Sequence, residues 1–422
     1  MNPQDKIEQI QSETEVSKLW NKNLILLIIG QVVSLFGNEI LRFALPLYIL
    51  YLTDSAAMFG TVAAVSFLPM IIISPVGGIL ADRVNKKRIM VVLDFITAVL
   101  VFLYILASGF MSVIPITIVV LMGLFAIMGI MSPTIDSSIP IIVPKDQLVR
   151  GNAAFMLVNI LSGMIGPAIG GILFAGFGIM PLLYVSGVSF ALAATMEIFI
   201  KIPNTKQKVM GGIWKMVKSD MKESFRFLSK KNPVLLKMIV VIALVQLVAT
   251  PMIFIGIPIL ITQYLGMGGD MFGFAKGAMG FGGLIGGILA GSLGPKLKVQ
   301  NSHLLLMGAI LCGVPLGLVF LIGVPVMVAY VTILISTALL MALAMIFSIQ
   351  VLAYVQLQAP TEILGKVMAL VTCLTMAAQP LGFLVYGFLF EELIHIPWVV
   401  IFTMVVLGVA VSGYSAKVFR GI

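Results

Sequence analysis

The chain alternates between long apolar runs and short polar segments along its whole length. Twelve of the runs approach or exceed the roughly 20 residues that a helix needs to cross a bilayer. They cover residues 24–52, 58–80, 89–108, 113–136, 153–176, 180–200, 234–262, 272–293, 303–322, 325–348, 367–390 and 398–416. Lipid offers backbone N–H and C=O groups no hydrogen-bond partner, so each run is expected to be a helix. The pattern predicts an all-α membrane protein with twelve transmembrane helices.

The basic residues indicate how these helices are oriented. If the chain crosses the membrane at every run, all but two of its 26 Lys and Arg residues fall on the side of the two termini. The exceptions are Arg42, inside the first run, and Lys276, which is expected to reach the outer surface with its ammonium group. Lys and Arg concentrate in cytoplasmic loops, so both termini are expected in the cytoplasm. The net charge of +9 then reflects topology and contact with anionic membrane lipids, not binding of nucleic acid.

The chain divides into two halves that resemble each other. A basic connector at residues 201–233 separates residues 1–200 from residues 234–422. GGILADRVNKKR, which begins at residue 77, aligns with GGILAGSLGPKL, which begins 209 residues later. VPKDQLVRGNA and APTEILGKVMA give a second match at an offset of 216 residues. Two independent matches with similar offsets predict pseudo-symmetric halves of six helices each, which suit a transporter that works by alternating access.

The connector itself contains a segment with helical spacing of apolar residues, IWKMVKSDMKESFRFLSK. This pattern predicts an amphipathic helix. Two placements are open: the helix lies at the membrane surface, or it packs on the cytoplasmic ends of the spans.

The charged loop after the second run gives the first indication of a family. Its basic residues can anchor the loop on the inner side, but an anchor needs no acid and leaves Asp82 unexplained. Residues 78–87, GILADRVNKK, resemble the signature loop of the major facilitator superfamily, G-x-L-A-D-R-x-G-R-K, with Asn85 in place of a glycine. Together with the twelve runs in two halves, the resemblance extends over essentially the whole chain.

In that family the loop holds the cytoplasmic side closed when the transporter faces outward. The resemblance implies that three residues of the loop contact the second half and that a following lysine pairs with an acid at the end of the fourth run. The gate residues are Gly78, Asp82, Arg83, Lys86, Lys87 and Asp136.

Several further segments resemble the drug–proton antiporters of macrolide-efflux type: QVVSLFGNEIL, SPTIDSSIPIIVPKDQL and GPAIGGIL. Residues 163–171, GMIGPAIGG, are similar to the antiporter signature G-x-x-x-G-P-x-x-G-G, with a first spacing one residue shorter. The resemblance implies a helix bend and a close-packing face made by Gly166, Pro167, Gly170 and Gly171. It also implies proton-coupled export of amphipathic, macrolide-like drugs. The arginine that many proton antiporters carry early in the fourth span is absent.

Charged residues inside the runs are candidates for function, because an ionised side chain in the membrane is costly. Glu39 and Arg42 lie three positions apart and share one helical face. Either they neutralise each other, or Glu39 takes up a proton while Arg42 sets the protonation balance or binds an anionic group. Asp94 is expected to pair with the basic loop. Glu197 is expected to pair with Lys201 at the inner surface.

Other classes of function fit poorly. The sequence has no G-x-x-x-x-G-K-[ST] phosphate loop for pumping driven by ATP. No His, Cys and Asp residues converge in the runs as an enzyme or a metal site would need. We expect a monomer in a bacterial inner membrane that binds a small amphipathic substrate, uses the proton gradient and holds no cofactor. The alternative to drug efflux is an exporter or flippase of a native metabolite, such as a siderophore or lysolipid.

The orientation can be tested with single cysteines in a chain that lacks Cys312 and Cys373. Cysteines at Ser12 and Ser219 are expected to resist a membrane-impermeant thiol reagent in intact cells, because both positions face the cytoplasm. A cysteine at Ser108 or Gly268 is expected to react. The reverse pattern would remove the basis for the topology.

Overall fold

The structure, a computed structural model, describes residues 21–144, 147–202, 213–293, 298–360 and 363–420. Within these ranges, twelve helical segments are long and apolar enough to cross a membrane, which confirms the predicted fold class. They are Lys22–Thr53, Ala56–Ala81, Lys86–Ala107, Val113–Ile142, Arg150–Phe177, Ile179–Glu197, Pro233–Tyr264, Gly269–Ser292, Val299–Ile322, Val326–Gln358, Lys366–Leu393 and Pro397–Phe419. Most ends lie within a few residues of the predicted runs. The tenth segment extends furthest beyond its prediction, by about three turns.

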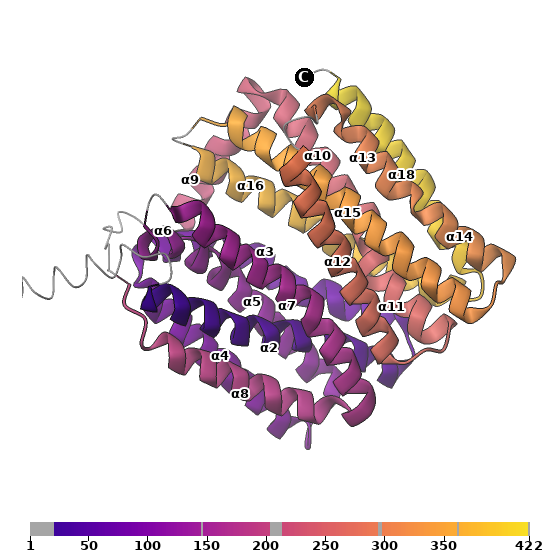
Figure 1. Cartoon of the computed structure of the whole chain (residues 1–422), viewed down its shortest axis with the longest axis horizontal. Helices are drawn as coiled ribbons and strands as arrows, with labels where there is room; N and C mark the ends of the chain where they lie inside the picture. The colour runs from indigo at the N-terminus through magenta and orange to yellow at the C-terminus, as the bar shows by residue number, and fades with distance from the viewer. Residues whose placement is uncertain (1–20, 145–146, 203–212, 294–297, 361–362, 421–422) are drawn as a thin grey trace, which may run out of the picture.

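Each half forms its own bundle (Figure 1), drawn from indigo to magenta in the first half and from rose to yellow in the second. The first bundle contains α2 (Lys22–Thr53), α3 (Ala56–Arg83), α4 (Lys86–Ala107), α5 (Val113–Asp136), α6 (Ile139–Ile142), α7 (Leu148–Phe177) and α8 (Ile179–Glu197). The second contains α10 (Pro233–Val248), η3 (Met252–Gly256), α11 (Ile257–Ile259), η4 (Leu260–Tyr264), α12 (Gly269–Leu293), η6 (Val299–Asn301), α13 (Ser302–Leu311), α14 (Gly313–Ile322), α15 (Val326–Gln358), α16 (Leu364–Ala377), α17 (Gln379–Leu393) and α18 (Pro397–Phe419).

The repeated GGILA segment has the same packing role in both halves. A Cβ atom added at Gly77 of α3 would collide with the carbonyl oxygen of Gly129 in α5. A Cβ added at Gly286 of α12 would collide in the same way with the carbonyl oxygen of Ala342 in α15. Small residues let helix backbones approach closely in a membrane, where the hydrophobic effect does not drive helices together. The two occurrences therefore join the second and fourth spans of their own halves.

The two halves touch through glycines that occupy equivalent places in the repeat. A Cβ at Gly171 of α7 would lie 2.5 Å from the carbonyl oxygen of Gly269 in α12. A Cβ at Gly60 of α3 would lie 2.8 Å from the Cα atom of Gly387 in α17. Gly269 follows Gly60 by 209 residues and Gly387 follows Gly171 by 216, the two offsets found in the sequence. We call this pair of contacts the glycine seam. It closes the face opposite the basic loops.

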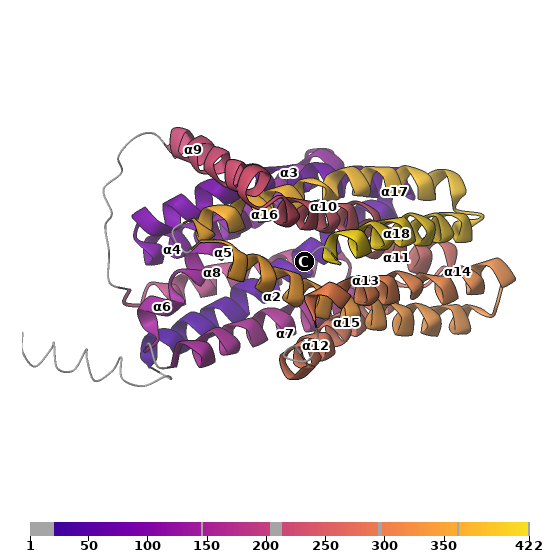
Figure 2. The ribbon, with the colours of Figure 1, turned by 90° about the horizontal axis from the view of Figure 1, so that it is seen from above.

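At the face with the basic loops, the connector helix α9 (Ile213–Arg226) packs on the ends of α16 and α3 (Figure 2). The ammonium group of Lys366 on α16 lies 3.1 Å from a carboxylate oxygen of Asp220 and 2.8 Å from one of Glu223. Of the two placements open for this helix, the structure has the one packed on the spans. Residues 203–212 of the connector lie outside the described residues.

The seam can be tested by adding a methyl group to one of its glycines. In Gly171→Ala, the new Cβ collides with backbone, and overpacking of this kind costs about 1–3 kcal/mol. The population closed at the seam is therefore expected to fall by roughly 5- to 150-fold relative to the open one. A cysteine at Ala63, in the cavity beneath the seam, should react faster with an impermeant thiol reagent applied from the seam face.

Gly163→Ala is the matched control on the same helix, because a Cβ at Gly163 meets no atom within 4 Å. Equal labelling of the Ala63 cysteine in both variants would contradict a seam that limits access.

Candidate functional site

A cavity of about 290 Å³ lies between the two halves. We call it the central cavity. Residues of α2, α3, α5 and α7 line it from the first half, and residues of η3, α12, α16 and α17 line it from the second. Its wall is mainly apolar and includes seven phenylalanines: Phe43, Phe59, Phe67, Phe125, Phe254, Phe272 and Phe383. The rings of Phe43 and Phe272 stack across the two halves with centroids 4.8 Å apart. An apolar wall with a few polar groups is typical of sites for small molecules.

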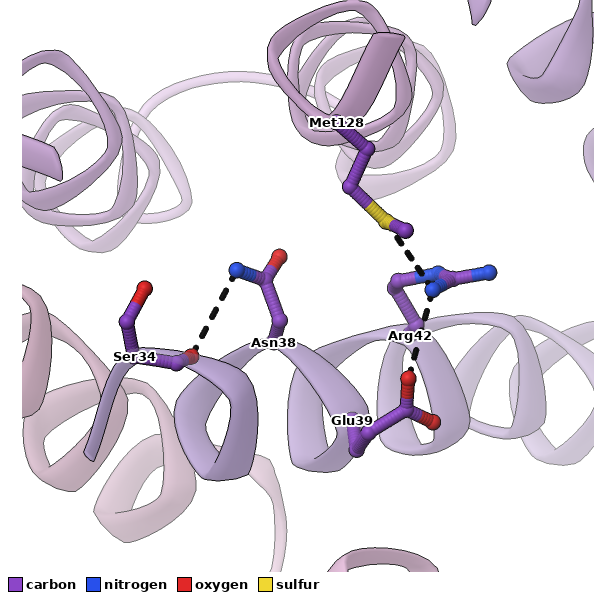
Figure 3. Close-up of polar contacts among 5 residues, drawn as sticks. All are labelled: Ser34, Asn38, Glu39, Arg42 and Met128. Carbon is purple, nitrogen blue, oxygen red and sulfur yellow. Dashed lines mark hydrogen bonds and ion pairs between the residues drawn. The ribbon is translucent and has the colours of Figure 1, made fainter. Parts of the chain in front are cut away.

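Glu39 and Arg42 lie together on α2 at the edge of this cavity (Figure 3). The Nη1 atom of Arg42 donates to Oε1 of Glu39 at 3.3 Å and to Sδ of Met128 at 3.0 Å. The guanidinium also lies over the ring of Phe125, 4.6 Å from its centroid. The side chains of Arg42 and Glu39 are 21% and 28% exposed. This geometry matches the mutual neutralisation that their spacing allowed.

Lys276 lines the same cavity from α12, so the expectation that it reaches the outer surface was wrong. Its Nζ atom lies 4.1 Å from the centroid of the Phe254 ring. The side chain also lies close enough to Glu39 and Arg42 to interact with both electrostatically. The sequence placed Lys276 near the start of a run but could not show that this face of α12 is turned toward the other half.

The predicted close-packing face of α7 lies against both halves. A Cβ at Gly166 would lie 2.8 Å from the Cβ of Glu39, and one at Gly170 would lie 3.5 Å from the Phe43 ring. Pro167 lies inside the helix, lacks a backbone N–H and lines the central cavity. Together with Gly171 in the seam, these residues let α7 pack between α2 and α12. Because Gly166 has no Cβ atom, the backbone of α7 can also approach the side chain of Glu39 closely.

A second cavity, of about 420 Å³, lies within the first half between α2, α4, α5 and α7. Glu39 lines this inner cavity as well as the central one. Asp136, Asn152 and Met156 line it and are exposed. These three residues lie near the ends of α5 and α7 that carry the basic loops, so the inner cavity is open toward that face.

Two buried acids lie in the first half, one of them, Asp94, at the wall of the inner cavity, and the sequence-based interpretation of both was wrong. Asp94 is 1% exposed and accepts a hydrogen bond from Ser34 Oγ at 3.0 Å, with no ion pair to the basic loop among the described residues. Glu197 is fully buried and accepts from Gln31 Nε2 at 3.0 Å, and Lys201 is likewise not its partner.

The two carboxylates lie close enough to interact electrostatically. One oxygen of each has no hydrogen-bond partner among the described residues. We call Asp94 and Glu197 the carboxyl pair. The short distance in sequence between these acids and basic residues did not predict their partners, because both side chains turn inward toward α2.

The structure does not assemble the predicted gate in this conformation. Lys86 donates to the carbonyl oxygen of Ala81 within its own loop, and neither Lys86 nor Lys87 forms an ion pair with Asp136. A Cβ at Gly78 would meet no atom within 4 Å.

Two gate residues of the loop remain, Arg83 and Asp82. Nη1 of Arg83 is buried without a hydrogen-bond partner among the described residues. The side chain of Asp82 lies outside the described residues. Since the halves are closed at the opposite face, the gate contacts stay a prediction for the other conformation.

Residues 27–383 match the Major Facilitator Superfamily. The chain belongs to this superfamily. It is 23% identical over 386 residues to macrolide efflux protein A of Streptococcus pyogenes, a match that covers 89% of this chain and 91% of that protein. It is 30% identical over 197 residues to the quinolone resistance protein NorA of Staphylococcus aureus, covering 46% and 49% of the two chains.

Among solved structures, a bacterial homologue of the iron transporter ferroportin in an inward-facing state superposes with a TM-score of 0.67. The sequences are 16% identical, and the match covers 93% of this chain and 98% of the other. This member of the superfamily is therefore a multi-pass membrane transporter and not an enzyme, as the sequence predicted.

Proposed function

We propose that this transporter exports amphipathic compounds by alternating access, driven by protons that move inward. The observation that carries the proposal is the central cavity, which both halves line and which combines an aromatic wall with three charged side chains. The relatives named for macrolide efflux and quinolone resistance support an exporter of drug-like compounds. Export of a native metabolite such as a siderophore or lysolipid would use the same cavity.

We assign the basic loops and both termini to the cytoplasm of a bacterial cell, on the asymmetry of Lys and Arg. In this orientation the glycine seam closes the outside, and the inner cavity opens toward the cytoplasm. The conformation is then the one that loads substrate from inside. We expect a monomer that needs no bound cofactor, since both halves of the cavity come from one chain.

We assign the coupling proton to the carboxyl pair in preference to Glu39. Glu39 already has a cation beside it, the guanidinium of Arg42. Asp94 and Glu197 are buried with neutral hydrogen-bond partners from α2 and no cation among the described residues. A buried carboxylate without a counter-charge is costly, and binding a proton removes the charge. Asp94 lines the inner cavity, which gives protons a route from the basic face.

The assignment predicts different behaviour for three neutral variants. Asp94→Asn and Glu197→Gln should fold, because an amide keeps the shape of a protonated acid, but should lose proton movement driven by substrate. Glu39→Gln should retain it. Proton movement can be measured in proteoliposomes that contain a pH-sensitive dye, to which cationic, neutral and anionic amphipathic compounds are added in turn. Proton movement that survives in both pair variants and disappears in Glu39→Gln would move the proton to Glu39.

The ion pair of Glu39 and Arg42 predicts a pattern of stability. Glu39→Gln strands the arginine and should lower the free energy of unfolding by about 1–3 kcal/mol, less than the cost of breaking a fully buried pair, because both side chains are partly exposed. The double variant Glu39→Gln with Arg42→Gln should recover most of the loss. Thermal unfolding in detergent measures all three proteins. A double variant no more stable than Glu39→Gln would show that the two charges are independent.

A further inference from the structure

The charges of the central cavity do not balance. The cavity contains one carboxylate, Glu39, and two cations, Arg42 and Lys276. Arg42 forms the ion pair with Glu39, which leaves the ammonium group of Lys276 without an ion pair or a hydrogen bond in the described part of the chain. The lining of the cavity therefore has an excess of one positive charge.

The hydrogen-bonding groups show the same imbalance. A guanidinium offers five N–H donors and an ammonium three. One nitrogen of Arg42, Nη1, is engaged, and its Nε atom is buried with no partner among the described residues. The other polar side chains of the lining are a single carboxylate, a hydroxyl and an amide: Glu39, Ser66 and Gln379. Donors outnumber acceptors, so the groups missing from this site are anionic oxygens.

A cation in an aromatic cavity is only partly compensated by the ring beneath it. The ring of Phe254 contributes a cation–π contact to Lys276, but this is weaker than pairing with an anion that also accepts hydrogen bonds. Lys276 belongs to the second half and Arg42 to the first. An anionic group placed between them would contact both halves of the transporter.

We propose that the transported compound is an amphipathic anion, with an aromatic or apolar body and one carboxylate or sulfonate group that pairs with Lys276 and the free side of Arg42. This inference rests on the proposed function, since it assumes that the central cavity carries substrate. The aromatic wall binds the body, and the two cations bind the anionic group. A cationic amphiphile of the same shape meets the unpaired charge of Lys276 and is repelled.

An anionic substrate also changes the energetics of export. In a cell with a negative interior, moving one negative charge outward is favoured by the membrane potential. A potential of 100 mV alone supports an outward gradient of about fiftyfold for a univalent anion. A cationic substrate and a proton would compete for the carboxylate of Glu39, whereas an anionic substrate does not bind there. This agrees with a proton carried by the carboxyl pair.

The test uses three probes that share one aromatic body: pyrenebutyrate, its neutral amide and the cationic pyrenebutylamine. Binding to the full chain in lipid nanodiscs is measured at neutral pH, with empty nanodiscs subtracted. Pyrenebutyrate should bind at least about tenfold more tightly than the amide, because a hydrogen bond to a charged group is worth that much. Lys276→Met should remove this advantage, so that pyrenebutyrate and the amide bind alike, while Lys276→Arg should keep it.

Lys298→Met is the matched control, because Lys298 is exposed and lies outside the central cavity. Two results would overturn the anionic class and leave export through the cavity standing: pyrenebutylamine binding most tightly, or pyrenebutyrate binding unchanged in Lys276→Met. Failure of all three probes to bind the native chain would overturn the central cavity as a substrate site, and with it the proposed function.

Discussion

The structure depends on the close approach of two pairs of glycines, Gly171 with Gly269 and Gly60 with Gly387. Each contact brings a helix of one half against a helix of the other at a distance that leaves no room for a Cβ atom. In a membrane such contacts depend on van der Waals packing, which falls off steeply with separation. The contacts of the seam are therefore either formed or broken, and intermediate separations of the helices are little stabilised. It closes one face above the central cavity, and the inner cavity opens toward the other.

This arrangement links the seam to the charges through α7. The helix contacts α12 through Gly171 and α2 through Gly166, where a Cβ atom would collide with Glu39. A movement of α7 relative to α2 that breaks the seam would also change the space around the ion pair. The cations of the central cavity come from different halves, so a ligand bound to both would respond to the same movement. The carboxyl pair lies apart from this contact, with Asp94 on the wall of the inner cavity.

The helices, their number and their repeat could be predicted from the sequence, because length and hydropathy decide what crosses a membrane. The offsets of 209 and 216 residues make Gly269 the repeat equivalent of Gly60 and Gly387 that of Gly171, but the sequence alone did not show that Gly171 meets Gly269 and Gly60 meets Gly387. The partners of Asp94, Glu197 and Lys276 could not be predicted in the same way. Nearby basic residues in the chain suggested surface pairs, whereas the rotation of each helix turns these side chains inward. The available signal was a charged residue inside an apolar run. Such a residue indicates that the side chain is buried, but it does not identify the group that the side chain contacts.

The most direct test of this account is the distance across the basic face when the seam is disturbed. Spin labels at Asn152 of α7 and Gln356 of α15, both exposed, report the separation of the halves there by double electron–electron resonance. In Gly60→Ala, the new Cβ would lie 2.5 Å from the carbonyl oxygen of Phe383. The account predicts that this variant gains a population with a shorter distance between the labels than the native chain, as the seam opens and the basic face closes. An unchanged distance distribution would contradict alternating access around the glycine seam.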